Sequence, residues 1–139
     1  MGIFDKLKKK EDTSNTMYYD EALESYVIEI KNIKFINEEE QNNEYINNLS
    51  KIADNYHKNL NNIIEFMLPD LKAMYGEIDE KSIIEKLGYP IIDYDNGIVK
   101  YLEQSFDNLH IFSFEFLDDE FKDIQYFSID GYFNKLQFM

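Results

Sequence analysis

The feature that most constrains the fold is an apolar stripe in the middle of the chain. Its members recur at steps of three and four residues and are Tyr45, Leu49, Ile52, Tyr56, Leu60, Ile63 and Met67. This spacing follows the helical period of roughly 3.6 residues, so these side chains share one face of an α-helix. The opposite face is rich in asparagine, whose helix propensity is low, so packing must stabilise the helix. The stripe predicts one long helix from residue 41 to about residue 67.

Further helical signals flank the stripe. The acidic run at residues 38–41 is expected to form the first helical turn, where carboxylates face the positive end of the helix dipole. Pro69 either ends the long helix or opens a second segment through Met74 and Tyr75, because proline fits a first turn. Residues 78–88 predict a short helix with Asp79 as its N-cap and Gly88 as its stop.

The rest of the chain carries strand patterns. Residues 26–35 alternate between apolar and polar side chains and predict one strand with a bulge near Asn32. Asp95, Asn96 and Gly97 lie between two apolar runs, and Asn-Gly supplies the positive φ angles of a tight hairpin. The aromatic run at residues 132–138 predicts a last edge strand.

A second hairpin is expected between residues 110 and 131. Phe112, Phe114 and Phe116 alternate with other residues and therefore share one strand face. Phe127 and Ile129 pair with that face from the returning strand, which places residues 118–123 at an acidic turn. Burial of the rings and solvation of the acids explain this segment without catalytic chemistry.

Length and composition predict one domain. A chain of 139 residues that is 44% hydrophobic and 16% aromatic can bury a core without disulfides. Helices next to hairpins indicate an α+β fold, with one long helix and shorter helices packed on a mainly antiparallel sheet. Residues 1–16 predict a flexible arm, basic and then polar, before a domain at residues 17–139; its lysines are Lys6, Lys8, Lys9 and Lys10.

The charge balance bears on partners. The chain has 28 acidic residues and a net charge of −14, and all 14 of its basic residues are lysine. Such a surface repels nucleic acid and anionic lipid, and it attracts a basic protein through electrostatic steering. Without arginine there is no guanidinium fork for phosphate recognition. A simpler interpretation is that the excess acid only keeps an aromatic-rich protein in solution.

The absence of cysteine excludes disulfides, thiolate metal sites and a cysteine nucleophile, and it favours a reducing compartment. No apolar run approaches the ~18 residues that span a bilayer, and no secretory signal pattern is seen. We therefore expect a cytoplasmic protein without stable membrane insertion.

The sequence contains no motif for catalysis or cofactor binding. His57 and His110 lack a metal-ligand spacing such as H-E-x-x-H, and the glycines are isolated rather than grouped in a phosphate-binding loop. The acidic turn lacks the alternating ligands and central glycine of a calcium loop. We expect no catalytic residue, no cofactor and no bound metal. An alternative enzyme would combine His57 or His110 with Glu115 or Asp130.

Residues 18–133 resemble a group of bacterial domains found beside polymorphic toxins and treated as immunity proteins. The motif residues are Leu87, Gly88, Pro90, His110, Ile111, Phe114, Glu115, Phe116, Phe121, Asp123, Ile124, Tyr126, Ile129, Asp130 and Gly131. The resemblance implies a small acidic α+β domain that blocks a cognate toxin by direct binding. It supplies no catalytic residues.

We therefore predict a protein-binding, immunity-type function, in which an acidic surface neutralises a basic toxin domain. The expected contact residues are Glu115, Asp118, Asp119, Glu120, Asp123, Tyr126 and Asp130. Exposed rings among them would supply apolar anchors. Two alternatives stand beside this prediction: a structural or regulatory module that self-associates, and a small hydrolase-like or metal-binding enzyme. The pattern does not fix the oligomeric state.

Overall fold

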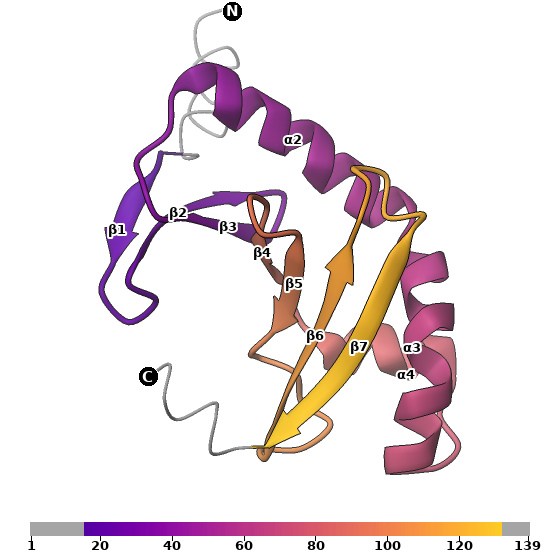
Figure 1. The fold of residues 1–139 in the computed structure, drawn as a ribbon. Helices are drawn as coiled ribbons and strands as arrows, with labels where there is room; N and C mark the ends of the chain where they lie inside the picture. Colours follow the sequence, from indigo (N-terminus) through magenta and orange to yellow (C-terminus); the bar gives the residue numbers. More distant parts are fainter. Residues whose placement is uncertain (1–15, 132–139) are drawn as a thin grey trace, which may run out of the picture.

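A seven-stranded sheet organises residues 16–131, the part of the chain that the computed structural model describes. The strands are adjacent in chain order (Figure 1) and are β1 (Tyr18–Asp20), β2 (Ser25–Ile30), β3 (Ile33–Asn37), β4 (Ile91–Asp93), β5 (Ile98–Tyr101), β6 (His110–Phe116) and β7 (Ile124–Gly131). The α+β class and the mainly antiparallel sheet are confirmed. All but the last residue of the predicted arm at residues 1–16, and the predicted edge strand at residues 132–138, lie outside the described residues.

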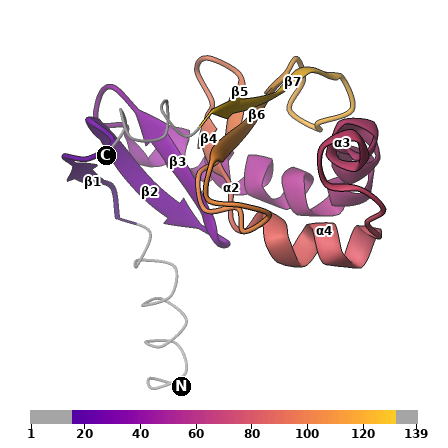
Figure 2. The ribbon, with the colours of Figure 1, turned by 90° about the horizontal axis from the view of Figure 1, so that it is seen from below.

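Three helices of the described part connect β3 to β4. They are α2 (Asn43–Lys58), α3 (Leu60–Tyr75) and α4 (Glu80–Leu87), and they lie on one side of the sheet (Figure 2). Their buried side chains join the inward strand residues in one core. Because the chain crosses over through these helices, β3 and β4 run parallel, whereas the other neighbouring strands pair antiparallel.

The predicted single long helix is wrong. Helices α2 and α3 have 16 residues each and are separated at Asn59, which has φ −104 and ψ 17. The side-chain Nδ2 of Asn59 donates to the carbonyl of Asn55 at 3.2 Å. Such local bonds compete with the helical ladder, so asparagine favours helix ends. The stripe still marks the buried face, which includes Leu49, Ile52, Tyr56, Ile63 and Met67.

Two further expectations about the helices need correction, and a third is confirmed. Pro69 neither ends a helix nor lies in a first turn. It lies inside α3, which continues to Tyr75. The acidic residues 38–41 precede α2, because Asn42 is the N-cap and its side chain accepts from the N–H of Tyr45. The short helix is confirmed: the side chain of Asp79 accepts from the N–H of Ser82 at 2.8 Å. Its C-cap is Gly88, as predicted.

Residues 26–35 form parts of two strands rather than one. Lys31 and Asn32, with φ 51 and 68, make a two-residue turn between β2 and β3. Two successive positive φ angles are typical of the hairpin turn whose twist matches its strands. The apolar alternation hid this reversal because Ile30 and Ile33 are paired across the hairpin and are both buried. Strand β1, which pairs with β2, was not predicted.

Both predicted C-terminal hairpins are confirmed. Asn96 and Gly97 lie in the turn between β4 and β5, but this turn has four residues, 94–97, and of the two only Gly97 has a positive φ, of 68. Phe112 of β6 pairs with Ile129 of β7, and the phenylalanines of β6 are buried against the helices. None of the helices within residues 16–131 combines the length and apolar content that crossing a bilayer requires.

Candidate functional site: an acidic edge and its cleft

The turn between β6 and β7 holds four of the predicted contact residues together: Asp118, Asp119, Glu120 and Asp123. Phe121 fixes this turn to the core, because its ring is fully buried and its centroid lies 4.9 Å from that of Phe116. Its φ of 59 is unusual for a bulky residue. Packing of the ring holds this backbone conformation, and the neighbouring Glu120 and Lys122 are exposed.

Asp118 organises the turn. Its carboxylate accepts hydrogen bonds from the backbone N–H groups of Lys122 at 3.2 Å, Asp123 at 2.6 Å and Glu120 at 2.7 Å. Desolvation raises the pKa of Asp118, but these donors outweigh it and hold the pKa below its ordinary value. Asp119, Glu120 and Asp123 remain exposed, and Glu120 forms an ion pair with Lys122 at 2.8 Å.

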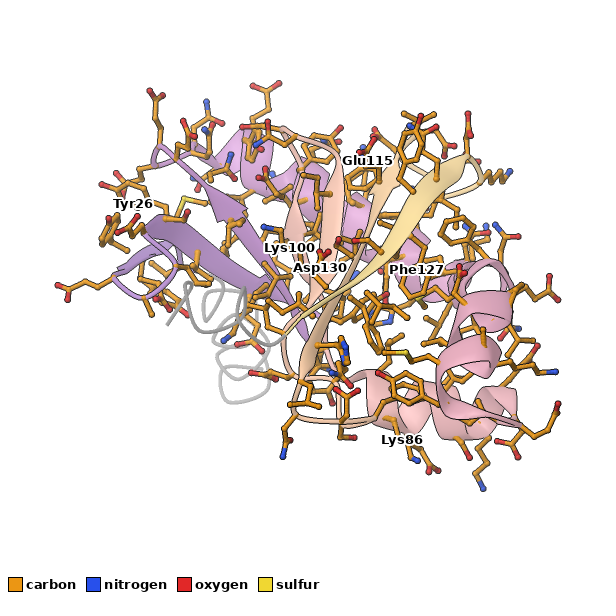
Figure 3. All side chains as sticks on the ribbon, turned by 60° about the horizontal axis from the view of Figure 1, so that its bottom comes forward. Tyr26, Lys86, Lys100, Glu115, Phe127 and Asp130 are labelled. Carbon is orange, nitrogen blue, oxygen red and sulfur yellow. The ribbon has the colours of Figure 1, made fainter. Side chains whose placement is uncertain are left out.

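The other three predicted contact residues lie apart from this turn. Glu115 is half-buried within β6, on the sheet face away from the helices, and accepts a hydrogen bond from Gln125 at 3.2 Å. Asp130 lies near the far end of β7, at a separate place on the sheet (Figure 3). Tyr126 has φ 55 and is 72% exposed. The structure therefore brings four of the seven residues together on one turn.

A second acidic turn, between β4 and β5, lies beside the first. The hydroxyl of Tyr94 donates to the carboxylate of Asp119, with distances of 3.0 Å to Oδ1 and 3.1 Å to Oδ2. Desolvation first, and then the Asp119 carboxylate, raise the pKa of Tyr94, so its hydroxyl keeps the proton that it donates. Helix α2 also holds the β6–β7 turn, because Asn55 Nδ2 donates a hydrogen bond to the backbone carbonyl of Asp119 at 3.0 Å.

The connection from β3 to α2 is joined to the β4–β5 turn by a three-residue network. Asn37 Nδ2 donates to Asp95 Oδ2 at 2.8 Å and to Tyr45 Oη at 2.9 Å. Tyr45 Oη donates to Asp95 Oδ1 at 2.8 Å. Desolvation raises the pKa of Tyr45 to about 12, and the hydrogen bond and charge of Asp95 add to the rise. The network holds Asp95 against the end of β3.

These contacts fasten three segments into one surface, which we call the acidic edge. It comprises Glu38, Glu39, Glu40, Glu44, Asp93, Asp95, Asp118, Asp119, Glu120 and Asp123. Lys122 is the one basic side chain within these segments, and it is paired with Glu120. A row of carboxylates on fixed turns creates a negative potential that attracts cationic groups.

A cleft of about 260 Å³ opens in the acidic edge at the carboxyl ends of the parallel strands β3 and β4. Within residues 16–131 its lining is mostly polar and consists of Ser25, Ile36, Asn37, Glu38, Glu39, Gln41, Asp93, Asp95 and Asn96. Of these described side chains, four are acidic and none is basic. The cleft is smaller than the roughly 300–1,000 Å³ of pockets that enclose a drug-sized ligand. It has room for one side chain or one small ion.

Asn37, which lines this cleft, has a buried side-chain oxygen without a hydrogen-bond donor among the described residues. The residue is 4% exposed, and its Oδ1 has no hydrogen-bond partner among residues 16–131. Turning the amide over would place Oδ1 against the Asp95 carboxylate, so the partners of Nδ2 fix the orientation. A buried acceptor without a partner costs about 1–3 kcal/mol, which makes such an atom uncommon.

The two histidines do not share a site. The ring of His57 contacts the carbonyl of Lys31 at 2.8 Å through Nε2, at the C-terminal end of α2. The ring of His110 contacts Asp107 Oδ2 at 2.8 Å through Nδ1, and Tyr75 Oη donates to the same oxygen at 2.6 Å. Their hydrogen-bond partners among the described residues are therefore Lys31 and Asp107 rather than Glu115 or Asp130. Within residues 16–131, no group of three or more histidine or acidic side chains has a metal-binding arrangement.

Sequence reasoning found the β6–β7 turn but missed the rest of the acidic edge. The sequence pattern predicts a helical turn for residues 38–41, and it places Asp95 in a hairpin turn without indicating its contact with Asn37. Asn37 gave no signal, because a single asparagine at a strand end is ordinary. No known protein family, curated protein or solved structure matches this chain. The resemblance to toxin-associated domains therefore stays a prediction.

Proposed function

We propose that this protein binds a basic polypeptide through the acidic edge. Its partner in this proposal is a cognate bacterial toxin, which it neutralises in the cytoplasm as an immunity-type protein. The observation that carries the proposal is that Asn37–Asp95 and Tyr94–Asp119 hydrogen bonds join three acidic segments. The toxin-associated motif, which includes Asp123 and Tyr126, supports the choice of partner.

Charge at the acidic edge favours rapid capture of a basic partner. The carboxylates gathered there are part of a net charge of −14 on the whole chain. Complementary charge mainly raises the association rate, and added salt weakens it as the screening length falls. We therefore expect an association rate that declines steeply with ionic strength.

Apolar side chains beside the acidic turn can slow dissociation. Leu117 is 58% exposed at the start of the turn, and Tyr126 is 72% exposed shortly after it. A few large buried anchors provide most of the affinity in protein interfaces, with polar contacts around them. The combination of an acidic turn and two exposed anchors is suited to a protein partner.

A matched pair of charge reversals tests this function. Candidate toxins are the proteins encoded beside the gene, and the readouts are growth protection on co-expression and affinity by surface plasmon resonance. Glu39→Lys/Asp123→Lys reverses two exposed charges on the acidic edge. Glu85→Lys/Glu103→Lys makes the same change in charge on α4 and after β5, away from that edge.

The edge variant is expected to bind at least tenfold more weakly and to lose protection, since each reversal replaces attraction with repulsion. The control variant is expected to keep both. Equal losses in the two variants would show a nonspecific effect of net charge. Absence of any toxin partner, together with no growth protection, would contradict the immunity-type function.

Self-association through β7 is a second candidate. Among the described residues β7 pairs only with β6, which leaves its other side without a strand. A groove of about 280 Å³ beside it is lined by Asp70, Ala73, Met74, Phe127 and Ile129. Pairing of two copies along β7 predicts a concentration-dependent dimer that Ile129→Lys disrupts. Sedimentation showing a monomer at all concentrations would exclude it.

A further inference from the structure

We infer that the cleft of the acidic edge receives one primary ammonium group, the end of a lysine side chain of the partner. This inference rests on the proposed function, in which the partner is a basic polypeptide. It goes further by naming the chemical group that is recognised and the atoms that recognise it.

Asn37 is among the residues that line the cleft, and its Oδ1 is a buried acceptor. The two hydrogen bonds made by Nδ2 fix the amide, and Oδ1 is left without a partner among the described residues. Because this oxygen exposes almost no surface, bulk water does not satisfy it. A donor that enters and slightly widens the cleft would complete its hydrogen bonding. A cationic donor is favoured, because Asp95 lies beside Asn37.

The two inner carboxylates of the cleft match single N–H donors better than a planar fork. Both oxygens of Asp95 already accept hydrogen bonds from Asn37 and Tyr45, and both oxygens of Asp93 accept from Asn96. A guanidinium group needs two free parallel acceptors on one carboxylate for its bidentate contact. The inner carboxylates, Asp93 and Asp95, do not offer that pair; Glu38 and Glu39 do, so the matching arginine probe is the direct competitor in the test.

Glu38 and Glu39 supply the other two acceptors. Both are exposed at the cleft and make no hydrogen bond or ion pair with another residue of the described part. With Oδ1 of Asn37 they provide three acceptors for the three protons of an ammonium group. Ile36, also in the lining, offers an apolar wall for the methylene stem of lysine.

Nuclear magnetic resonance on the ¹⁵N-labelled protein tests the assignment without a known partner. The probe is Nα-acetyl-L-lysine methylamide, and the observed signals are the side-chain amide of Asn37 and the backbone amides of residues 38–41 and 95–96. We expect shifts that saturate in the millimolar range. The analogue acetylated on Nε, which lacks the charge, is expected to cause at least tenfold weaker binding.

Two variants with the same change in charge localise the effect. Glu38→Gln/Glu39→Gln is expected to weaken binding of the lysine probe at least fivefold. Glu85→Gln/Glu103→Gln, away from the acidic edge, is expected to leave it unchanged. Saturation by Mg²⁺ alone, equal binding of the matching arginine probe, or no shift at Asn37 would overturn the inference.

The two proposals fail separately. If a toxin binds the wild type and Glu38→Gln/Glu39→Gln equally well, the cleft assignment is wrong and the partner proposal stands. If the lysine probe saturates the cleft but no basic protein partner is bound, the cleft assignment stands and the proposed function is wrong.

Discussion

The hydroxyl oxygen of Tyr94 lies 3.0 Å from Oδ1 of Asp119, and this contact joins the β4–β5 turn to the β6–β7 turn. Each turn alone carries a few acidic side chains whose charge solvent can screen. Because the hydrogen bond joins the two turns, their acidic side chains form one continuous surface of fixed geometry. The relative position of the two turns is therefore part of the proposed binding site.

Replacing Tyr94 with phenylalanine tests this link. Tyr94→Phe removes the hydrogen bond to the Asp119 carboxylate, and we expect a loss of about 1 kcal/mol in the free energy of unfolding. Urea denaturation followed by circular dichroism measures it. The matched control is Tyr126→Phe, because the Tyr126 ring is 72% exposed and its hydroxyl has no partner among residues 16–131. A similar loss in both variants would show that the link adds nothing.

Gly97 determines how closely the β4–β5 turn approaches β6. It has φ +68, and a Cβ added there would lie 2.9 Å from the carbonyl oxygen of Phe116. Gly97→Ala therefore combines left-handed backbone strain, which costs about 1–2 kcal/mol, with a steric clash. The expected loss of stability exceeds about 1.5 kcal/mol, measured by the same urea titration.

Gly131 provides the control for that substitution. No atom lies within 4 Å of a Cβ built at Gly131, so Gly131→Ala is expected to change stability by less than about 0.5 kcal/mol. Equal effects at Gly97 and Gly131 would mean that the turn relaxes freely and does not position Asp95.

The sequence predicted the elements that depend on local chemistry. Asp79 and Gly88 bound α4 as expected, and a turn at Asn96 and Gly97 follows from the freedom of glycine to take a positive φ. The buried face of α2 and α3 also followed from spacing alone. The break at Asn59 did not, because an apolar stripe continues across it and the competing hydrogen bond is made by one side chain.

The candidate site depends on contacts between distant segments, and that is why most of it was missed. Asn37 and Asp95 are 58 positions apart, and Tyr94 and Asp119 are 25 apart. Periodicity reports which face of an element is buried, but it does not report which turns meet. The acids of residues 118–123 were found because they lie together in the sequence.

The buried pair Tyr56 and Tyr101 offers a test of the core beneath the acidic edge. Their hydroxyl groups share a hydrogen bond, and the residues are 2% and 0% exposed. Tyr101→Phe leaves the Tyr56 hydroxyl without a partner, which is expected to cost about 1–3 kcal/mol. Tyr56→Phe/Tyr101→Phe removes both polar groups and is expected to be less destabilised than the sum of the single variants.

Calorimetry of the four proteins in this double-mutant cycle measures the coupling between the two hydroxyl groups. Additive losses would indicate that the hydroxyl groups do not depend on one another. The acidic edge is tied to this pair through Phe121, whose ring centroid lies 5.6 Å from that of Tyr56. The single variants are therefore also expected to broaden the resonances of residues 118–123.

Asp107 is expected to make the free energy of unfolding decrease at acidic pH. Desolvation raises its pKa, but hydrogen bonds from Tyr75 Oη, the N–H of Leu109 and the His110 ring outweigh it and hold the pKa well below the usual range. A carboxyl whose pKa is lowered by folding stabilises the native state above its unfolded pKa of about 3.9, and this contribution is lost as the pH falls toward the folded pKa. At pH 7, Asp107→Asn is expected to be about 2 kcal/mol less stable than the wild type.

The decisive measurement is how that difference changes with pH. As the pH falls below about 4, the wild type gains a proton on Asp107 while the asparagine variant cannot, so the gap between their unfolding free energies should narrow. Asp70→Asn is the matched control, because it removes one charge from an exposed residue of α3 with no hydrogen-bond partner in the described part of the chain. Its stability should follow the wild type at every pH. A gap for Asp107→Asn that stays constant from pH 7 to pH 3 would show that the carboxylate charge is not what these donors stabilise.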